Sequence, residues 1–246
     1  MKKITQSIIK SAINYDEGAC GGEIMAGLNR IQRKPSPAML LGIYFEYLVT
    51  GSTGLTEEIP QPVLLKSGEL SAPYRTCVAQ AERVKDLLNK MNIKILEVGA
   101  YHERDDIGGH FDIIATVNGE KSIIDIKYSA NAEDKWSPWG WGWNDKQKEF
   151  HSIQAAHYSK IFNHQLPFYY LVTEANENGR IDFYEIQLTD DLIKRHDLRI
   201  QLAKDMLDLA EFGLQYRPEY NRCEICPVKE ECQFRMFAPN PKTIVI

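Results

Sequence analysis

Two aspartates and a lysine stand in strand-like, apolar surroundings near the middle of the 246-residue chain. Asp112 follows Gly109-His110-Phe111, and Asp125-Ile126-Lys127 comes shortly after it, on the expected facing strand of a hairpin. The side chains of residues 125 and 127 point to the same face of a strand, and hairpin pairing brings Asp112 alongside them. We therefore expect two carboxylates and one ammonium group to converge.

This combination of groups suits phosphodiester hydrolysis. The reaction needs a cation to neutralise developing charge and to generate hydroxide near neutral pH, and hard Mg²⁺ or Mn²⁺ prefers carboxylate oxygens. Asp112 and Asp125 fit as ligands, and Lys127 fits a role in stabilising the charged transition state or orienting the attacking water. The alternative is that Asp125 and Lys127 are exposed on a strand and Asp112 lies in a loop, because an isolated D-x-K pattern is common by chance.

Helices and strands that could position these residues follow from the hydrophobic spacing. Apolar residues at helical spacing predict a helix over 36–50, which carries Glu46 and ends at Gly51-Ser52, and a second helix over 74–91. Strand-like runs follow at 93–101, 111–117 and 122–128. Asn118-Gly119 joins the last two as a hairpin, so we expect neighbouring antiparallel strands.

The second half of the chain repeats this mixture of elements. We expect a helix at about 146–162, strands at 168–173 and 181–187 around an Asn178-Gly179 turn, and a long helix at about 190–213. The order of helices and strands predicts the α/β class, with a mixed sheet flanked by helices. A hydrophobic content of 43% is sufficient for one substantial core, so we expect a single domain over 1–246.

The order of these motifs resembles the PD-(D/E)-x-K nuclease superfamily, in its RecB-like branch. Gln154-Ala155-Ala156-His157-Tyr158 reproduces the Q-x-x-x-Y motif of that branch, and Gly42 to Glu46 matches its glycine-to-glutamate element on an N-terminal helix. Phe111 stands where the superfamily has its proline, and Glu46 where the CRISPR-associated members usually have histidine.

The resemblance implies a restriction-endonuclease-like fold and a set of roles. Asp112, Asp125, Lys127, Gln154 and Tyr158 would be the catalytic residues. Mg²⁺ or Mn²⁺ would be held by Glu46, Asp112, Asp125 and the backbone carbonyl of Ile126. Gln154 and Tyr158 would contact DNA phosphate or help to order the site.

Four cysteines form a second candidate metal site. Cys223, Cys226 and Cys232 form a compact C-x2-C-x5-C group, and Cys20 lies far upstream. In a reducing compartment such thiolates suit either tetrahedral zinc or an iron-sulfur cluster, and the spacing does not choose between them. Cys77, beside Val78 in an expected helix, fits a packed core thiol.

The cysteine arrangement resembles AddB-type helicase-nucleases and small CRISPR-associated exonucleases. This resemblance implies a [4Fe-4S] cluster held by Cys20, Cys223, Cys226 and Cys232. The cluster would join segments at about 15–30 and 215–240, next to a nuclease core at about 36–190.

A tryptophan-rich segment lies between the D-x-K strand and the Q-x-x-x-Y helix. Its tryptophans are Trp136, Trp139, Trp141 and Trp143. Beside a catalytic metal they could stack unpaired bases. The alternative is a rigid, packed loop or a contact between subunits, because exposed aromatic residues also mark protein interfaces.

Composition sets limits on partners and location. A formal net charge of −5 argues against a general polyanion binder, so any DNA site must be local. No apolar run is long enough to cross a bilayer and Met1 to Lys10 lacks a secretory signal, so we expect a cytoplasmic protein without a membrane partner.

From the resemblance, we expect a DNA exonuclease acting on single strands or free ends, in CRISPR adaptation, repair or phage recombination. A homo-oligomer, or a complex with a CRISPR or recombination protein, is compatible with this expectation. The alternative function is a non-catalytic or partner-activated DNA-binding protein of the same fold.

Overall fold

A computed structural model describes residues 3–17, 20–21, 35–52, 60–132, 141–143 and 145–212. The chain divides into two compact units, one formed by Met1–Lys3 and Pro35–Ile193 and the other by Ile4–Lys34 and Lys194–Ile246. The assignment of the whole chain to a single domain stays a prediction. Among the helices of the described residues, none is both long and apolar enough to span a bilayer.

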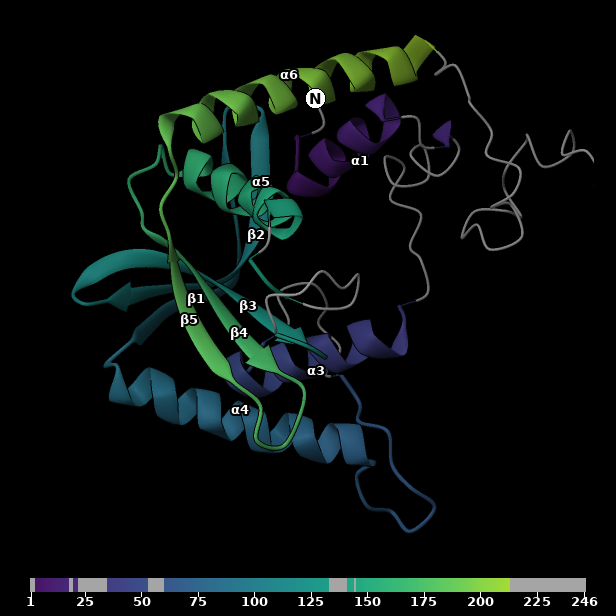
Figure 1. Ribbon diagram of the computed structural model, residues 1–246, viewed down its shortest axis with the longest axis vertical. Coiled ribbons are helices and arrows are strands. Elements are labelled where there is room, and N and C mark those ends of the chain that lie inside the picture. The colour runs from purple at the N-terminus through teal and green to yellow at the C-terminus, as the bar shows by residue number, and fades with distance from the viewer. Residues whose placement is uncertain are drawn as a thin grey trace, which may run out of the picture. The chain divides into compact units, whose positions relative to one another are not determined.

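The first unit is built on one five-stranded sheet with the strand order β1-β2-β3-β4-β5 (Figure 1). The strands are β1 (Lys94–Arg104), β2 (Ile107–Val117), β3 (Glu120–Ser129), β4 (Phe168–Glu174) and β5 (Ile181–Ile186). The pairs β1–β2, β2–β3 and β4–β5 are antiparallel, whereas β3 and β4 are parallel. The predicted mixed sheet of the α/β class is therefore confirmed.

The turn between β2 and β3 fixes the register of the two strands. Asn118 and Gly119 both have positive φ angles, 51° and 87°. Two left-handed residues in succession are what a two-residue type I′ hairpin requires. Val117 pairs with Glu120 across this turn, and the ladder continues to Ile113 and Ile124, so the predicted hairpin is confirmed.

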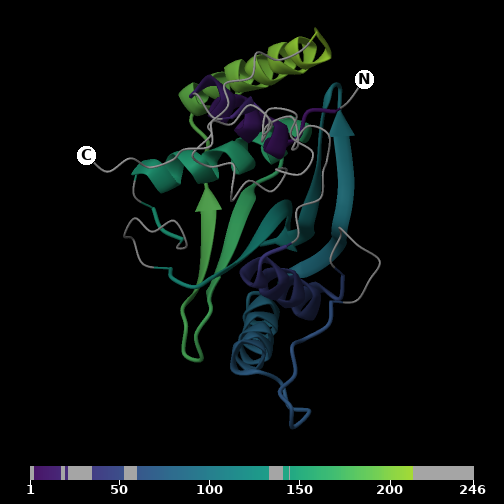
Figure 2. The same ribbon diagram turned by 90° about the vertical axis from the view of Figure 1, so that its right-hand side faces the viewer.

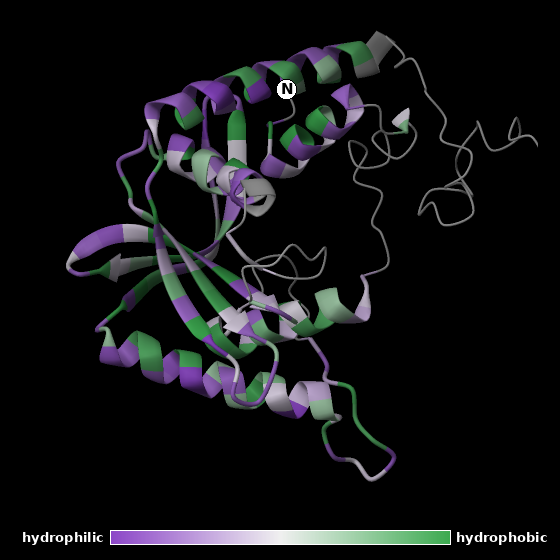
Figure 3. Ribbon diagram, in the orientation of Figure 1, coloured by the Kyte–Doolittle hydropathy of each residue, from purple (hydrophilic) through white to green (hydrophobic). Residues whose placement is uncertain are grey.

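Helices α3 (Pro37–Thr50) and α4 (Ala72–Lys90) cover one face of the sheet (Figure 1). The Ser36 hydroxyl caps α3 by accepting from the Met39 amide, and Gly51 ends the helix with a φ of 78°. Hydrophilic and hydrophobic residues alternate around α4 (Figure 3). Its buried positions at helical spacing include Cys77, Ala81, Val84 and Leu88, and they pack with strand residues that include Ile113, Ile124 and Leu171.

Helix α5 (Asp145–Ile161) covers the opposite face of the same sheet (Figures 1 and 2). The Tyr158 ring packs against Phe111, with centroids 4.5 Å apart, and the buried His157 ring makes a 3.1 Å hydrogen bond with the Gly108 carbonyl. Burial is the main cause that lowers the pKa of His157 to about 4, so this hydrogen bond belongs to a neutral ring near pH 7. These contacts tie α5 to the outer half of β2.

The sheet opens between β2 and β3 at Asp112. Within the described residues, the β2–β3 ladder ends at Ile113 and Ile124. Beyond that point β2 stays paired with β1 as far as Ile107, and β3 stays paired with β4 as far as Ser129. Two strands that were neighbours therefore separate at the position where the sequence places its carboxylates.

The second unit contains α1 (Gln6–Asp16) and all but the first residues of α6 (Asp190–Phe212), which lie side by side in both views (Figures 1 and 2). The predicted long helix, α6, is confirmed. Helix α1 was not predicted, although Thr5 caps it and Ile8, Ile9 and Ala12 form its buried face. Five residues of the sequence predictions lie outside the described residues: Cys223, Cys226, Cys232, Trp136 and Trp139.

Candidate active site

Asp112 reaches across the opening in the sheet. One oxygen of its carboxylate, Oδ2, accepts a hydrogen bond of 2.8 Å from the backbone amide of Ile126. This bond occupies an amide of β3 beyond the last residue that pairs with β2. The hairpin thus brings Asp112 next to the D-x-K segment, as predicted, through a side-chain contact and not through continued strand pairing.

Asp125 is the most deeply buried carboxylate of the group, with 1% of its side chain exposed. The Lys127 ammonium forms an ion pair with its Oδ2 atom, and the Gln154 amide of α5 donates to its Oδ1 atom. A buried carboxylate with no such partners would be strongly destabilising. The structure therefore brings three sequence-predicted residues into direct contact, from β3 and from α5.

Glu46 lies on α3, which packs against the other face of the sheet. Burial and the charges of Asp112 and Asp125 raise the pKa of Glu46 to about 8, although Lys127 acts in the opposite direction. Burial and the charge of Asp125 likewise raise the pKa of Asp112 to about 7. Three carboxylates thus repel one another around one ammonium group.

Lys127 is partly exposed, with 28% of its side chain accessible, whereas Asp125 is buried. Burial acts to lower its pKa, but Asp125 and Asp112 outweigh burial, so the pKa of Lys127 is raised and the group is a cation near neutral pH. The ammonium lies 6.0 Å from the ring centroid of Trp141 and 5.9 Å from that of Tyr170. The rings of Trp141 and Tyr170 therefore form an aromatic wall beside Lys127, on the side that Asp125 does not occupy.

The aromatic wall is a packed cluster. Trp141, with 7% exposure, stacks on His151 with ring centroids 3.5 Å apart, and Tyr170 is fully buried against Trp141. Trp143 meets Tyr184 edge to face at 4.8 Å. For Trp141, this packing matches the packed-loop alternative and not an open stacking platform.

Gln154 and Tyr158 play different parts although they share a helix face. Gln154 is 7% exposed and reaches Asp125, whereas Tyr158 is 5% exposed and its ring packs against Phe111 and Phe168. The structure is thus consistent with Gln154 ordering the active site, and it gives Tyr158 a place in the core beneath Gly109. A contact of either residue with DNA phosphate stays a prediction.

The chemistry of the donors fits a hard divalent cation. The site holds more negative charge than Lys127 can balance, and a bound cation would relieve the repulsion that raises the two carboxyl pKa values. Among the described residues, however, no three His, Cys, Asp or Glu side chains stand close enough together to hold a metal ion. The three-carboxylate set with the Ile126 carbonyl therefore stays a prediction.

Of the predicted cluster cysteines, the structure describes Cys20 alone, as a partly exposed free thiol. Cys77 is fully buried in the core between α3 and α4, and burial raises its pKa to about 12. The prediction of a packed core thiol at Cys77 is confirmed.

Sequence reasoning missed two features on the same face of the sheet. Tyr170 and His151 complete the wall beside Lys127, and Arg180, which immediately precedes β5, contacts Asp182 of β5, which in turn contacts Tyr184. The alternation of polar residues with Ile181 and Phe183 was the available signal, since residues two apart share a strand face.

Comparison with known proteins was informative at the level of the fold. No protein-family model matches the sequence, and no curated protein matches it either. A solved structure from Eubacterium rectale, described as a "putative exonuclease", superposes with a TM-score of 0.65 at 18% identity, covering 100% of this chain and 91% of that one. A phage-related exonuclease from Haemophilus somnus 129PT gives a TM-score of 0.37 at 14% identity over 76% of this chain and 100% of its own, too low to support an argument. The chain therefore shares its fold with the Eubacterium rectale protein.

Proposed function

We propose that the protein is a metal-dependent DNA exonuclease that hydrolyses phosphodiester bonds in single strands or at free ends. The observation that carries the proposal is the group of Asp112, Asp125 and Lys127 at the opening of the sheet, with Gln154 bound to Asp125. A buried group of like charges beside one lysine costs stability, and such an arrangement is typical of functional sites. Fold-level likeness to a protein named as an exonuclease agrees with this proposal.

The residues of the chain have distinct parts in this mechanism. Asp112 and Asp125, with the Ile126 carbonyl and with Glu46 from the other face, would hold Mg²⁺ or Mn²⁺. The ion would neutralise phosphate charge and lower the pKa of a water molecule that attacks phosphorus. Lys127 supplies a fixed positive charge for the developing negative charge, and Gln154 holds the Asp125 carboxylate in position.

The substrate ends and the biological setting belong to the proposal too. A strand with a free end is the substrate that the family resemblance suggests, in CRISPR adaptation, repair or phage recombination. A [4Fe-4S] cluster on Cys20, Cys223, Cys226 and Cys232 is the second cofactor that we propose. The alternative function is a binding protein of the same fold that does not cleave or that needs a partner.

Digestion of labelled DNA tests the nuclease. Linear and circular single strands and duplexes would be incubated with Mg²⁺, Mn²⁺ or EDTA, using wild-type protein and the variants Asp125→Asn and Lys127→Met. We expect metal-dependent shortening of linear DNA, intact circles, and a loss of at least about a hundredfold in both variants. Glu120→Gln, an exposed carboxylate on the same strand, is the matched control and should digest normally.

The outcomes separate the candidate functions. Cleavage of circular DNA would show that the protein is an endonuclease and not an exonuclease. If the Asp125→Asn variant still digests DNA at the wild-type rate, Asp125 is not part of the active site. Binding of DNA by folded wild-type protein without cleavage in any metal would favour the non-catalytic or partner-activated alternative.

A further inference from the structure

An oriented arginine, Arg180, immediately precedes β5 on the face of the sheet that carries the candidate catalytic group. Ile181 and Phe183 pack with the core beneath α3 and α4, so the residues between them face the opposite side, as Asp125 and Lys127 do. The register aligns Lys127 with Val172 and Val172 with Asp182. Lys127 and Asp182 therefore belong to one row across three strands.

Arg180 lies one row further along the same face. The Glu174 amide donates to the Arg180 carbonyl at 2.9 Å, which continues the β4–β5 pairing by one step. Two strand spacings and one two-residue step separate Arg180 from Lys127, which gives about 12 Å between their Cα atoms. Both side chains are long, so a strand of a few nucleotides can contact both.

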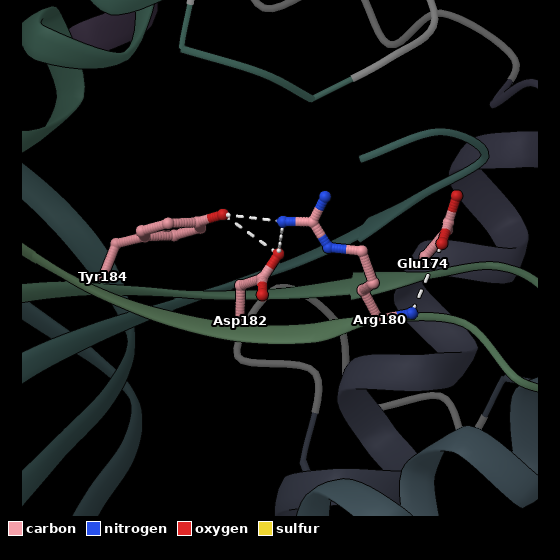
Figure 4. A network of polar contacts seen from close by, with 4 residues as sticks. All are labelled: Glu174, Arg180, Asp182 and Tyr184. Atoms are coloured by element: carbon pink, nitrogen blue, oxygen red, sulfur yellow. Dashed lines mark hydrogen bonds and ion pairs between the residues drawn. The ribbon is translucent and has the colours of Figure 1, made fainter. Parts of the chain in front are cut away.

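A small network fixes the direction of the Arg180 guanidinium (Figure 4). Its Nη2 atom lies 2.6 Å from Asp182 Oδ2, and the Tyr184 hydroxyl donates to that same oxygen at 2.9 Å. The other terminal nitrogen points away from Asp182 (Figure 4), and 55% of the Arg180 side chain is exposed. An exposed ion pair contributes little to stability, whereas an arginine held in this way offers an aimed set of donors to a phosphate.

Aromatic rings lie beside Lys127, in the row that contains Asp125, Tyr170 and Tyr184 and not in the row of Arg180. The wall that begins at Lys127 with Trp141 and Tyr170 continues through Trp143, 6.2 Å from Tyr170, to Tyr184 at the base of the arginine network. Lys127 and Arg180 are therefore two cations on one face of the sheet, and the packed aromatic wall borders them at Lys127 and at Tyr184. In a chain of net charge −5, this pattern is local, as a nucleic-acid site in such a chain must be.

We propose that Arg180, held by Asp182 and Tyr184, is a substrate subsite that binds a backbone phosphate of the polynucleotide a few nucleotides from the bond cleaved beside Lys127. The inference rests on the proposed nuclease function and extends it, because it assigns the direction in which the strand leaves the site. Arg180 does not contact the reacting phosphate, so it acts on binding of long substrates and not on the chemical step.

Steady-state kinetics with substrates of two lengths test this subsite. Arg180→Gln and Arg180→Lys would be compared with wild type on a labelled single-stranded oligonucleotide and on bis(p-nitrophenyl) phosphate, which is too small to reach Arg180. For Arg180→Gln we expect KM for the oligonucleotide to rise about tenfold with kcat unchanged. Hydrolysis of the small diester should be unaffected, and Arg180→Lys should recover part of the loss.

Salt dependence and a matched cation complete the test. Loss of one phosphate contact should reduce the slope of log KM against log salt concentration by about 0.7. Lys121→Gln removes another ion-paired cation, at the far end of β3 beside Glu97, and should leave both substrates unaffected. An unchanged KM in Arg180→Gln, or an equal loss on both substrates, would overturn the subsite.

Binding separates this inference from the proposed function. If wild-type protein cleaves neither substrate, the nuclease proposal fails, and fluorescence anisotropy of the oligonucleotide in EDTA still examines Arg180. A tenfold weaker Kd in Arg180→Gln but not in Lys121→Gln supports the subsite, and equal affinities reject it.

Discussion

Two carboxyl groups of the candidate site have raised pKa values because they are buried close to other carboxylates. Burial together with neighbouring carboxylates raises the pKa of Glu46 from 4.5 to about 8 and that of Asp112 from 3.8 to about 7. In the unfolded chain both groups ionise at the lower values. Without metal, the folded protein therefore binds more protons than the unfolded chain between about pH 4 and pH 8, and its stability falls as pH rises through that window.

Removing one of these charges should stabilise the metal-free protein at alkaline pH. In EDTA, the Tm of wild-type protein should fall between pH 6 and pH 9, and Glu46→Gln should raise the Tm at pH 9 by about 2–4 °C, which corresponds to about 1 kcal/mol for a chain of this size. Differential scanning calorimetry would measure both effects. The exposed Glu120→Gln should leave the pH dependence unchanged. A Glu46→Gln protein that melts lower than wild type at pH 9 would contradict the repulsion.

Metal binding should depend on pH in the opposite direction, and should become stronger as pH rises. Because Mn²⁺ binds ionised carboxylates, it must displace protons from Glu46 and Asp112 near pH 7. Calorimetric titration in buffers of different ionisation enthalpy should show proton release that declines toward pH 9, together with an affinity that rises with pH. Proton release that does not change in Glu46→Gln would place Glu46 outside the metal site.

At the scale of elements, the position of α5 depends on a glycine in β2. A Cβ atom on Gly109 would lie 2.8 Å from Cε1 of the buried Tyr158 ring, whereas a Cβ on Gly42 of α3 would meet nothing within 4 Å. Since Gln154 on α5 reaches Asp125, the close approach at Gly109 also affects the geometry of the candidate site.

Two glycine substitutions should therefore have opposite signs. Gly109→Ala should destabilise the protein by about 1–3 kcal/mol, because an overpacked core must shift side chains or backbone. Gly42→Ala, in the interior of a helix, should be neutral or stabilising by up to about 1 kcal/mol. Urea unfolding would measure both. Equal effects of the two substitutions would show that the contact with Tyr158 relaxes freely.

Local sequence patterns predicted the helices and strands well. They did not predict which strands pair over long distances in the sequence. Asn118-Gly119 specified its hairpin because the turn and the register lie within one short segment. The parallel pairing of β3 with β4 could not be read, because a crossover through α5 separates the two strands in sequence. The sequence motif identified Gln154 as a candidate residue. Its contact with Asp125 could be seen only in the structure, because the two residues lie on different elements.

The residues of the candidate site also divide according to what a strand pattern encodes. Asp125 and Lys127 share a face by period alone, and the sequence predicted their contact. Tyr170, Trp141 and Arg180 come to that face from segments whose order in the sheet was unknown. Their roles therefore emerged only once the neighbours of β3 and β5 were fixed.

At the scale of the whole molecule, the proposed cluster concerns the two ends of the chain. Cys20 and the C-terminal cysteines belong to the second compact unit, whereas Asp112, Asp125, Lys127 and Glu46 belong to the first. Closing a loop between distant residues is entropically costly, and metal binding can supply the free energy for it. We therefore expect the cluster to act on stability and the carboxylates to act on chemistry.

Two cysteine substitutions should distinguish a cluster ligand from a thiol that only packs in the core. Cys226→Ala should lose the brown colour, iron and sulfide of anaerobically purified protein and lower its Tm, because it removes a proposed cluster ligand. Cys77→Ala should keep colour and iron, yet lose about 1 kcal/mol of stability, because it leaves a cavity at a fully buried position between α3 and α4. Absorption spectra, metal analysis and thermal melts on both variants provide the measurement. If the wild-type protein is colourless and contains zinc, the four thiolates form a zinc site and not an iron-sulfur cluster. If the Cys226→Ala protein is brown and has an unchanged Tm, Cys226 is not a ligand.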